Sequence, residues 1–236
     1  MADTYVAIVS AGRPGNVPAM EAHCQGLAPT WWVPADQVGD YRYCGAERVQ
    51  AGDGLCEARN LAADAADGRP HVQLSDDLRH VALAHGPERA NVVRITLAEA
   101  VRVLADAAAA TGAQLAGCAP TANPYFSRRR VHATGFVVGD LVWVAGGCPL
   151  RWDTTLALKE DYDYTCQHLA AYGKVARCDW LLATFAHRTN RGGAVAYRTP
   201  ELEDATIAQL IHRWPQAVRP NARRPHEVLL RWPASP

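Results

Sequence analysis

The residues best suited to chemistry in this sequence are carboxylates in two short clusters. Glu160, Asp161 and Asp163 stand together in "LALKEDYDYTCQHLAAYG", at the start of a segment with helical periodicity. Acids here have an ordinary explanation, because the helix dipole favours negative charge near an N-terminus by roughly 0.3–1 kcal/mol. The alternative is that one of them is a catalytic carboxylate. These residues alone leave both explanations open.

The second cluster is Ser75-Asp76-Asp77, which closes an apolar segment. Paired carboxylates at a strand end suit a hard divalent cation, which in turn holds phosphate oxygens. A turn with helix-capping acids explains the same residues equally well. Other polar side chains are candidates to complete such a site: Arg13, Arg59, Asn60 and His187.

His187 lies in the segment "FAHRTNRGG". A lone histidine is more often structural than a ligand. Here, however, Asn190, Gly192 and Gly193 provide a hydrogen-bonding loop of the kind that closes on phosphates. Spacing alone supports a metal or phosphate contact and a structural role equally.

The segments that must position these residues alternate between strand and helix patterns. The strands expected in the first half are 5–10, 30–34, 71–77 and 91–95. The helices expected there are 55–67 and 96–112, the first with an apolar face of Leu55, Ala58, Leu61, Ala62 and Ala65. A Thr96–Glu99 capping box and Gly112 mark the ends of the second. This alternation predicts an α/β fold with a mostly parallel sheet covered on both faces, with ligands at the carboxyl ends of the strands.

The second half has a different pattern. Segment 133–147 predicts two strands joined by a hairpin turn at Gly139-Asp140. The later elements expected are a helix at 158–172 stopped by Gly173, a strand and polar loop within 179–197, a helix at 201–213 and a strand at 227–232. Neither a linker nor an internal repeat is evident, so a single domain over 1–236 is expected.

Composition excludes several classes of protein. Lysine and arginine total 24, as do aspartate and glutamate, so net charge indicates no partner. The seven cysteines lack CxxC pairs, which favours reduced core thiols over a disulfide framework or a structural zinc site. We expect no signal peptide and no membrane span.

Five segments occur in an order that resembles a metal-dependent nucleotide-sugar glycosyltransferase with a GT-A-like, single Rossmann-like domain: "YVAIVSAGRPGNV", "CEARNLAADAA", "LSDDL", "LKEDYDYTCQHLAAYGKVAR" and "FAHRTNRGGAV". The last two are most similar to the TET-associated glycosyltransferases. These are phage and bacterial enzymes thought to add sugars to hydroxymethylated pyrimidines in DNA. The resemblance extends over residues 5–232, and its N-terminal segments are shared with many glycosyltransferases.

The resemblance implies roles for individual residues. Those implied for the nucleotide-sugar are Ser10, Gly12, Arg13, Arg59, Asn60, Asp76, Asn190, Gly192 and Gly193. Asp77 would be the principal ligand of Mn²⁺ or Mg²⁺, and His187 a later one. Ser75 departs from the pattern, because it stands where an Asp-x-Asp motif commonly has its first acid. This leaves the metal with fewer anionic ligands.

The resemblance also bears on the first cluster. Transfer to a hydroxyl needs a base for the acceptor proton while a metal neutralises the departing diphosphate. Acids at this helix start match the position of the base in inverting members of the fold, so Asp161, with Glu160 next, is the expected base. The helix dipole is expected to lower the pKa of Asp161 and keep it ionised, while Asp163 is expected elsewhere around the helix.

A DNA acceptor requires basic side chains gathered on one face. The segment "NPYFSRRR" places aromatic rings beside arginines, which can stack on an extruded base and grip phosphates. The candidates are Tyr125, Phe126, Arg128, Arg129 and Arg130, with Arg219, Arg223 and Arg224 nearer the C-terminus. A solvated basic loop is an equal alternative.

These inferences predict a metal-dependent, inverting transferase that moves a sugar from a UDP-sugar to 5-hydroxymethylcytosine in DNA, in the cytoplasm (of a bacterial host, if phage-encoded). One alternative is the same fold with a small-molecule, lipid or protein acceptor. Another is an inert nucleotide- or DNA-binding module. A sugar-phosphate nucleotidyltransferase is disfavoured, because the N-terminal region has no Gly-rich loop with a matching lysine.

Overall fold

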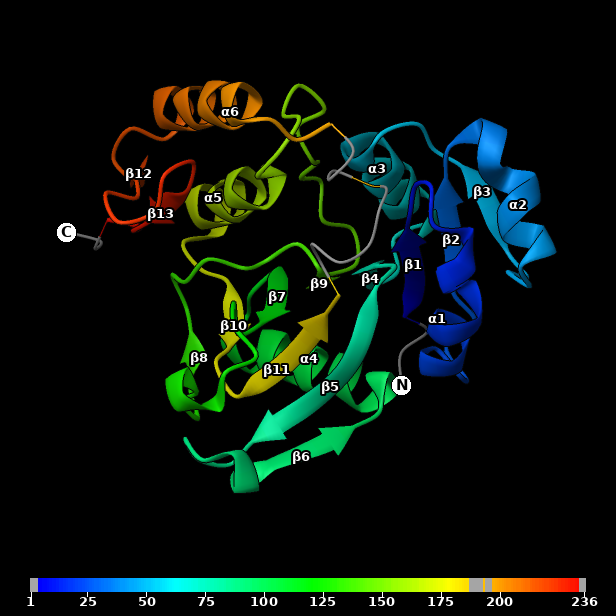
Figure 1. Cartoon of the computed structure of the whole chain (residues 1–236). Helices are drawn as coiled ribbons and strands as arrows, with labels where there is room; N and C mark the ends of the chain where they lie inside the picture. Colours follow the sequence, from blue (N-terminus) through cyan, green and yellow to red (C-terminus); the bar gives the residue numbers. More distant parts are fainter. Residues whose placement is uncertain (1–3, 187–192, 194–196, 234–236) are drawn as a thin grey trace.

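The computed structural model describes residues 4–186, 193 and 197–233. Its helices are α1 (Val17–His23), α2 (Val38–Tyr43), α3 (Leu55–Ala65), α4 (Leu97–Thr111), α5 (Glu160–Tyr172) and α6 (Pro200–Arg213). Its strands are β1 (Tyr5–Val9), β2 (Thr30–Val33), β3 (Val49–Ala51), β4 (His71–Ser75), β5 (Leu78–Ala84), β6 (Val92–Ile95), β7 (Leu115–Cys118), β8 (Val131–His132), β9 (Leu141–Val144), β10 (Ala176–Cys178), β11 (Leu181–Phe185), β12 (Val218–Pro220) and β13 (Val228–Leu230). Figure 1 shows their arrangement.

Eight of the described strands form the central sheet, in the order β3-β2-β1-β4-β9-β7-β10-β8. Strands β3, β2, β1 and β4 run parallel to their neighbours, as do β7 and β10. Strand β9 lies antiparallel between β4 and β7, and β8 lies antiparallel to β10. Two antiparallel additions, β11-β5-β6 and β12-β13, complete the fold. The expected α/β class, with a mostly parallel, Rossmann-like sheet, is confirmed.

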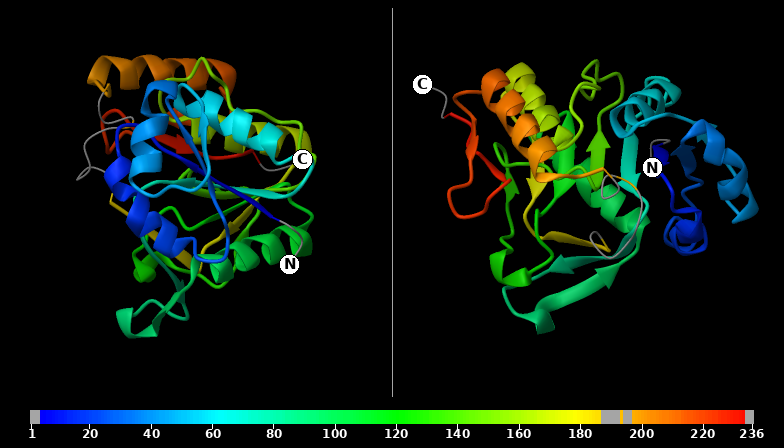
Figure 2. Two further views of the ribbon diagram at one scale, coloured as in Figure 1. Left: turned by 90° about the vertical axis from the view of Figure 1, so that its right-hand side faces the viewer. Right: turned by 45° about the horizontal axis from the view of Figure 1, so that its top comes forward.

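Helices cover both faces of this sheet (Figures 1 and 2). Along β1, Val6 and Ile8 pack with α1 and α4, whereas Ala7 packs on the opposite face against Ala58 and Ala62 of α3. Strand β9 divides its side chains in the same way, between α4 and α5. The alternation of a strand buried on both sides therefore builds two cores. Helix α6 and the β12-β13 pair pack outside α5.

The expected hairpin over 133–147 is wrong. Only β9 forms there, and 133–140 is a loop. The backbone N–H of Val137 donates to Thr165 Oγ1, and the Thr165 hydroxyl donates to Val137 O, both at 3.2 Å. A side chain of α5 thus satisfies backbone groups that a second strand would have used. Gly117 on β7 accommodates the loop, since a Cβ there would lie 2.4 Å from Val137 Cγ1.

The expected apolar face of the helix at 55–67 is partly wrong. Ala58 and Ala62 of α3 are buried as expected, but Ala65 is exposed and Arg59 is buried. Arg59 can be buried because its guanidinium stacks on the Trp152 ring and donates to the Gly139 carbonyl, as described below.

None of the helices in the described ranges is long and apolar enough to cross a bilayer. All seven cysteines are free thiols, and six are buried, as expected.

Candidate active site at the carboxyl ends of the sheet

The loop after β1 is fastened to the end of β4. Ser10 Oγ lies 2.5 Å from the Tyr41 hydroxyl and donates to Asp76 Oδ2. The Tyr41 hydroxyl also accepts the backbone N–H of Arg13 at 3.0 Å. Of these four residues, Ser10, Arg13 and Asp76 belong to the expected donor-binding set, and Tyr41 supports them. The carboxyl ends of β1 and β4, which are neighbours in the sheet, therefore share one polar site.

Asp76 and Asp77 follow β4, and both are buried. Arg13 Nη1 lies 2.8 Å from Asp76 Oδ1 and 3.9 Å from Asp77 Oδ2. Burial raises the pKa of Asp76, and the hydrogen bond from Ser10 and the charge of Arg13 oppose this rise. One guanidinium thus faces two carboxylates.

These carboxylates fit a divalent cation in part. Asp76 accepts from Ser10 with one oxygen and from Arg13 with the other, so both of its carboxylate oxygens already have hydrogen-bond donors. Across the described ranges, no group of three His, Cys, Asp or Glu side chains could hold a metal ion. The expected site residues that lie outside the described residues are His187, Asn190 and Gly192.

Described residues on either side of that stretch contact the acidic site. The Ala186 N–H donates to Asp77 O at 2.9 Å, and the Gly193 N–H donates to Ala11 O at 3.0 Å. Gly193 has a φ of +56°, and a Cβ on it would lie 3.1 Å from Arg13 Nη2. Glycine therefore allows the backbone to approach the Arg13 loop closely. Gly193 therefore lies beside the Arg13 loop, and its expected contact with the nucleotide-sugar stays a prediction.

The other acidic cluster begins α5. Lys159 precedes the helix with a φ of +56°, and its ammonium group pairs with Glu203 of α6. Asp161 Oδ2 accepts the Gly139 N–H and Oδ1 accepts the Tyr162 N–H, both at 3.0 Å. Two backbone donors therefore fix the orientation of the Asp161 carboxylate.

The expectation that the helix dipole lowers the pKa of Asp161 is wrong. Burial raises this pKa to about 7, and the charges of Glu160 and Asp140 act in the same direction. The Gly139 N–H and the charge of Arg59 oppose the rise without cancelling it. A general base works best with a pKa near the operating pH. Asp161 is thus a stronger candidate base than its place on a helix implied.

Arg59 lies beside this carboxylate and is 3% exposed. Its Nη2 donates to Gly139 O at 2.8 Å, and its guanidinium lies 4.3 Å from the centre of the Trp152 ring. Its Nε and Nη1 have no hydrogen-bond partner within the described part of the chain. Because buried donors are normally satisfied, these two are candidates to receive oxygens of an anionic ligand.

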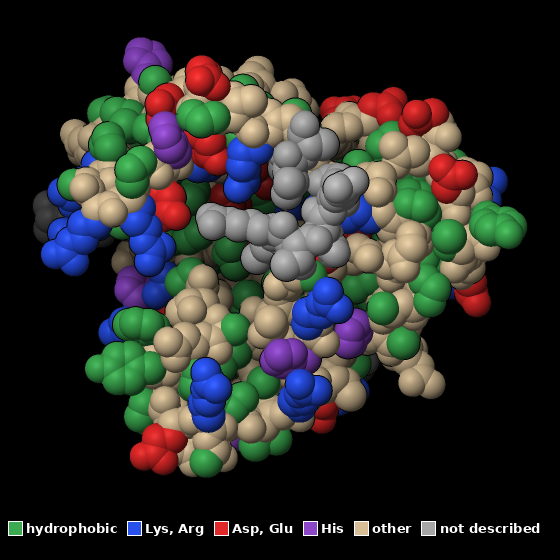
Figure 3. Space-filling view, viewed as in Figure 1, with side chains coloured by type: hydrophobic (Ala, Val, Ile, Leu, Met, Phe, Trp, Pro, Cys, Tyr) green, Lys and Arg blue, Asp and Glu red, His purple; other side chains and the backbone are tan. Residues whose placement is uncertain are grey.

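The turn at Gly139 and Asp140 joins the two acidic clusters. Ser75 at the end of β4 donates its N–H to Asp140 O at 2.8 Å and its hydroxyl to Asp140 Oδ1 at 3.3 Å. Gly139 meanwhile bonds Asp161 and Arg59 on its other side. Figure 3 shows the surface of this face hollowed between the part that carries α5 and α6 and the part that carries β5, β6 and β11.

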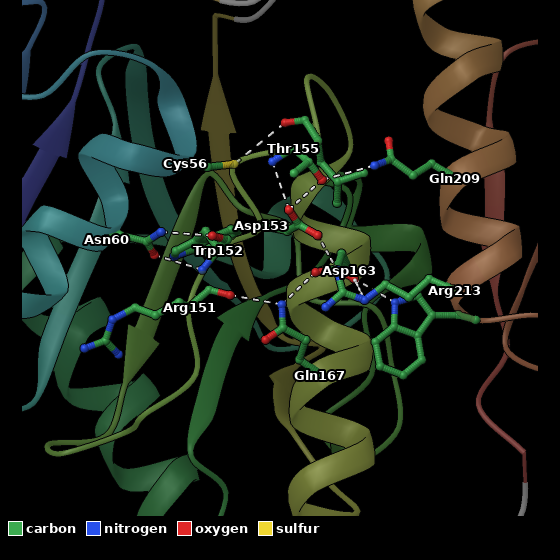
Figure 4. A network of polar contacts seen from close by, with 12 residues as sticks. Cys56, Asn60, Arg151, Trp152, Asp153, Thr155, Asp163, Gln167, Gln209 and Arg213 are labelled. Atoms are coloured by element: carbon green, nitrogen blue, oxygen red, sulfur yellow. Dashed lines mark hydrogen bonds and ion pairs between the residues drawn. The ribbon is translucent and has the colours of Figure 1, made fainter.

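Two polar residues near the site use their side chains for hydrogen bonds within the protein (Figure 4). Asn60 donates to Trp152 O and accepts from the Trp152 N–H, both at 2.9 Å, so its expected contact with the nucleotide conflicts with its hydrogen bonding. Asp163 is fully buried and accepts from Trp214 Nε1 at 2.7 Å and from Gln167 Nε2 at 2.6 Å. The expectation that Asp163 lies apart from Asp161 is confirmed.

The expected DNA-contacting residues lie together in the loop between β7 and β8. Tyr125 and Phe126 are 66% and 62% exposed, and their rings meet edge to face at 5.2 Å. Arg128 donates to Tyr125 O and Ser127 O, which braces the turn. Arg130 pairs with Asp179 at 3.1 Å and remains 61% exposed, and Arg129 is exposed. The loop thus presents aromatic and cationic side chains to solvent side by side.

Sequence reasoning missed several residues that build the site. Gln37 accepts the Gly12 N–H at 2.7 Å, Tyr41 holds the Arg13 loop, and Trp152 stacks on Arg59. Their local sequence carries no motif that could have revealed them. Asp140 was visible, but its Gly-Asp pair was interpreted as a hairpin turn.

No protein-family model matches the chain, and no curated protein matches it significantly.

Proposed function

We propose that this protein is a nucleotide-sugar-dependent glycosyltransferase whose base is Asp161. The observation that supports this most is the pairing of two chemically different acids at one edge of the sheet. Asp161, with a pKa of about 7, is linked through the Gly139–Asp140 turn to Ser75, which directly precedes the buried pair Asp76 and Asp77. A transferase needs a proton acceptor at one end of its site and a place for a diphosphate at the other.

The donor would lie on the β1 and β4 side of the site. Ser10, Gly12 and Arg13 belong to the loop there, and Arg13 balances part of the carboxylate charge. Asp77, together with His187, would hold Mn²⁺ or Mg²⁺. When bound, such a cation neutralises charge on the departing diphosphate. Arg59 would offer its unpaired N–H groups to the anionic part of the donor.

The transfer step balances with one base. The acceptor oxygen forms a bond to the anomeric carbon as the bond from that carbon to the diphosphate oxygen breaks. The diphosphate leaves with the electron pair, and Asp161 takes the acceptor proton. Direct displacement on this path inverts the anomeric carbon. Glu160, buried next to Asp161, supports the step by keeping the pKa of that base high.

We further propose that the acceptor is the hydroxymethyl group of 5-hydroxymethylcytosine in DNA. The exposed aromatic pair Tyr125–Phe126 and the arginines Arg128, Arg129 and Arg130 support a nucleic-acid contact. They form one patch on a chain whose net charge is zero. Both substrates exist in a cytoplasm, where we expect the protein to act.

A transfer assay tests this proposal. DNA containing 5-hydroxymethylcytosine is incubated with a panel of UDP-sugars and Mn²⁺, then digested to nucleosides for mass spectrometry. A gain of one sugar mass on the modified nucleoside is expected. UDP release without that gain would keep the transferase and discard the DNA acceptor, in favour of a small-molecule, lipid or protein acceptor. Neither signal would favour an inert binding module.

A variant pair tests the donor side separately. Asp77→Ala is expected to abolish Mn²⁺-dependent UDP binding in calorimetry, because the principal anionic ligand is gone. Asp106→Ala removes an exposed carboxylate on α4 and is expected to bind UDP as the parent does. Equal binding by both variants would contradict the metal role of Asp77.

A further inference from the structure

A cleft of about 250 Å³ lies against the Gly139–Asp140 turn, whose Gly139 N–H donates to the candidate base Asp161. Its walls are the segment 118–122 after β7, Val138 and Asp140 in the loop before β9, and Ala183–Phe185 at the end of β11. Three chain segments far apart in sequence thus meet around one space.

The cleft adjoins two features that matter for binding an acceptor. Gly139, which donates to Asp161, stands between the two wall residues Val138 and Asp140. Another part of the wall, at Thr121 and Ala122, continues directly into the loop that carries Tyr125, Phe126 and the arginines. The cleft therefore adjoins both the turn that contacts the candidate base and the start of the proposed DNA-contacting loop.

Its size and lining restrict what it can take. Pockets for drug-sized ligands enclose roughly 300–1,000 Å³, so this smaller space suits a single ring. Ala119, Pro120 and Val138 give apolar walls against which a flat heterocycle can lie. Among the described lining residues, Asp140 supplies the one carboxylate. A carboxylate accepts a hydrogen bond from the N4 amino group of cytosine and repels the O4 carbonyl of a uracil-type ring.

We propose that this cleft receives one pyrimidine extruded from the DNA duplex, and that Asp140 selects cytosine by accepting a hydrogen bond from its N4 amino group. The inference rests on the proposed transferase and deepens it, because it specifies how the acceptor is bound and which ring is chosen. Extrusion brings the 5-hydroxymethyl group out of the base stack and into reach of Asp161. Arg128, Arg129 and Arg130 would contact the phosphates that flank the extruded nucleotide.

A competition assay tests the selection. Two duplexes that differ only in 5-hydroxymethylcytosine or 5-hydroxymethyluracil are mixed with enzyme and donor, and the ratio of products is measured. The parent is expected to prefer cytosine by about tenfold. In Asp140→Asn the amide donates to O4, so the preference is expected to fall or reverse. The charge of Asp140 also raises the pKa of Asp161, and a ratio within one mixture cancels that effect on rate.

Asp106→Asn, on the exposed face of α4, is the matched control and is expected to keep the parent's preference. An unchanged preference in Asp140→Asn, while the protein remains folded by circular dichroism, would overturn the selection by Asp140.

Extrusion itself has a readout that needs neither donor nor turnover. A duplex with 2-aminopurine next to 5-hydroxymethylcytosine is titrated with the parent protein, and its fluorescence is expected to rise as stacking is lost. Ala122→Trp fills the cleft and is expected to suppress the rise, whereas Ala110→Trp on the surface of α4 is not. Binding by anisotropy without any fluorescence rise would overturn extrusion. Failure of the transferase itself appears separately, as absence of UDP release in the transfer assay.

Discussion

Two helices of this protein, α4 and α5, begin with acidic side chains, and they use them in opposite ways. At the start of α4, Glu99 accepts the Thr96 N–H at 2.8 Å while Thr96 Oγ1 accepts the Glu99 N–H at 3.2 Å. Both residues are exposed, and the hydrogen bonds from Thr96 lower the pKa of Glu99. This is a capping box whose acid stabilises the helix it begins.

At the start of α5, the N-cap residue Lys159 makes no capping hydrogen bond with its side chain. Glu160 and Asp163 are buried, and burial raises the pKa of Asp161 to about 7. The helix dipole lowers carboxyl pKa values at the N-termini of both helices. At α5, however, the loss of water and the charges of neighbouring carboxylates raise the pKa of Asp161 by more than the dipole lowers it. Acids at a helix start therefore indicate a cap when they are exposed and a candidate site when the fold buries them.

The largest effect expected from this contrast is on catalysis. Asp161→Asn keeps a hydrogen-bond acceptor for the backbone but cannot take a proton, so transfer is expected to fall by about 100- to 10,000-fold. Initial rates from nucleoside mass spectrometry measure this, and calorimetry checks that UDP binding persists. Glu99→Gln is the matched change at α4 and is expected to be fully active. Equal rates for Asp161→Asn and the parent would end the assignment of the base.

The next effect is on the pH dependence of stability. The folded pKa of Asp161 lies above its ordinary value of 3.8, so the native state holds a proton that the unfolded state releases. The free energy of unfolding of the parent is then expected to fall by up to about 4 kcal/mol between pH 4 and pH 7, relative to Asp161→Asn. Urea unfolding at several pH values measures this.

The effect of Glu99 on the pH dependence of stability is opposite in sign, because the pKa of Glu99 is lowered in the folded state. Relative to Glu99→Gln, the parent is expected to be favoured above the ordinary pKa of glutamate, and to lose this advantage as pH falls through the folded pKa. Parallel slopes for the Asp161 and Glu99 variants would remove the contrast between the two helix starts.

A smaller change in stability is expected from Asp163→Ala. The loss of this fully buried carboxylate leaves Trp214 Nε1 without its acceptor and Arg213 without the partner 3.2 Å away, while Gln167 Nε2 keeps only its bond to Arg151 O. Arg213 is partly exposed and can turn to water, so we expect a cost of about 3 kcal/mol, near the low end for a broken buried pair. Thermal and urea unfolding measure it. Asp106→Ala, an exposed acid on α4, serves as the control, and a similar small cost for both would show that Asp163 is not integral to the packing of α6.

The smallest effect is expected at the exposed cap. Thr96→Ala removes the side chain that accepts the Glu99 N–H, and typical caps of this kind contribute about 1 kcal/mol. The same unfolding experiments detect the change, and Thr121→Ala, in a loop outside any helix, is the comparison for loss of a threonine. A cost above that of Asp163→Ala would reverse the ranking of the two helix starts.

Much of the fold could be predicted from local sequence. The strand at 5–10, the capped helix at 96–112 and the helix stopped by Gly173 appear where the pattern placed them, within a few residues. Their ends depend on nearby chemistry, such as the Thr96–Glu99 box and the left-handed glycines Gly112 and Gly173. Interactions within one or two turns of chain are encoded in the sequence itself.

Local sequence could not show whether 133–147 forms a hairpin. Its loop depends on partners far along the chain, since Val137 bonds Thr165, and Gly139 bonds Arg59 and Asp161. A Gly-Asp pair between apolar segments predicts a hairpin whether or not such distant partners are present. The packing of α5 on the sheet makes 133–140 a loop and not a strand.

The same distinction between local sequence and distant contacts applies to the candidate site. Local sequence alone shows which residues carry charge, and it predicts that one acidic cluster follows a strand and that the other begins a helix. The tertiary structure decided that Ser75, Asp140, Gly139 and Asp161 form one hydrogen-bonded path, that Asn60 serves the fold, and that the pKa of Asp161 rises. The physical reason is that a pKa depends on how much water and which charges surround a group, and these are set by segments distant in sequence.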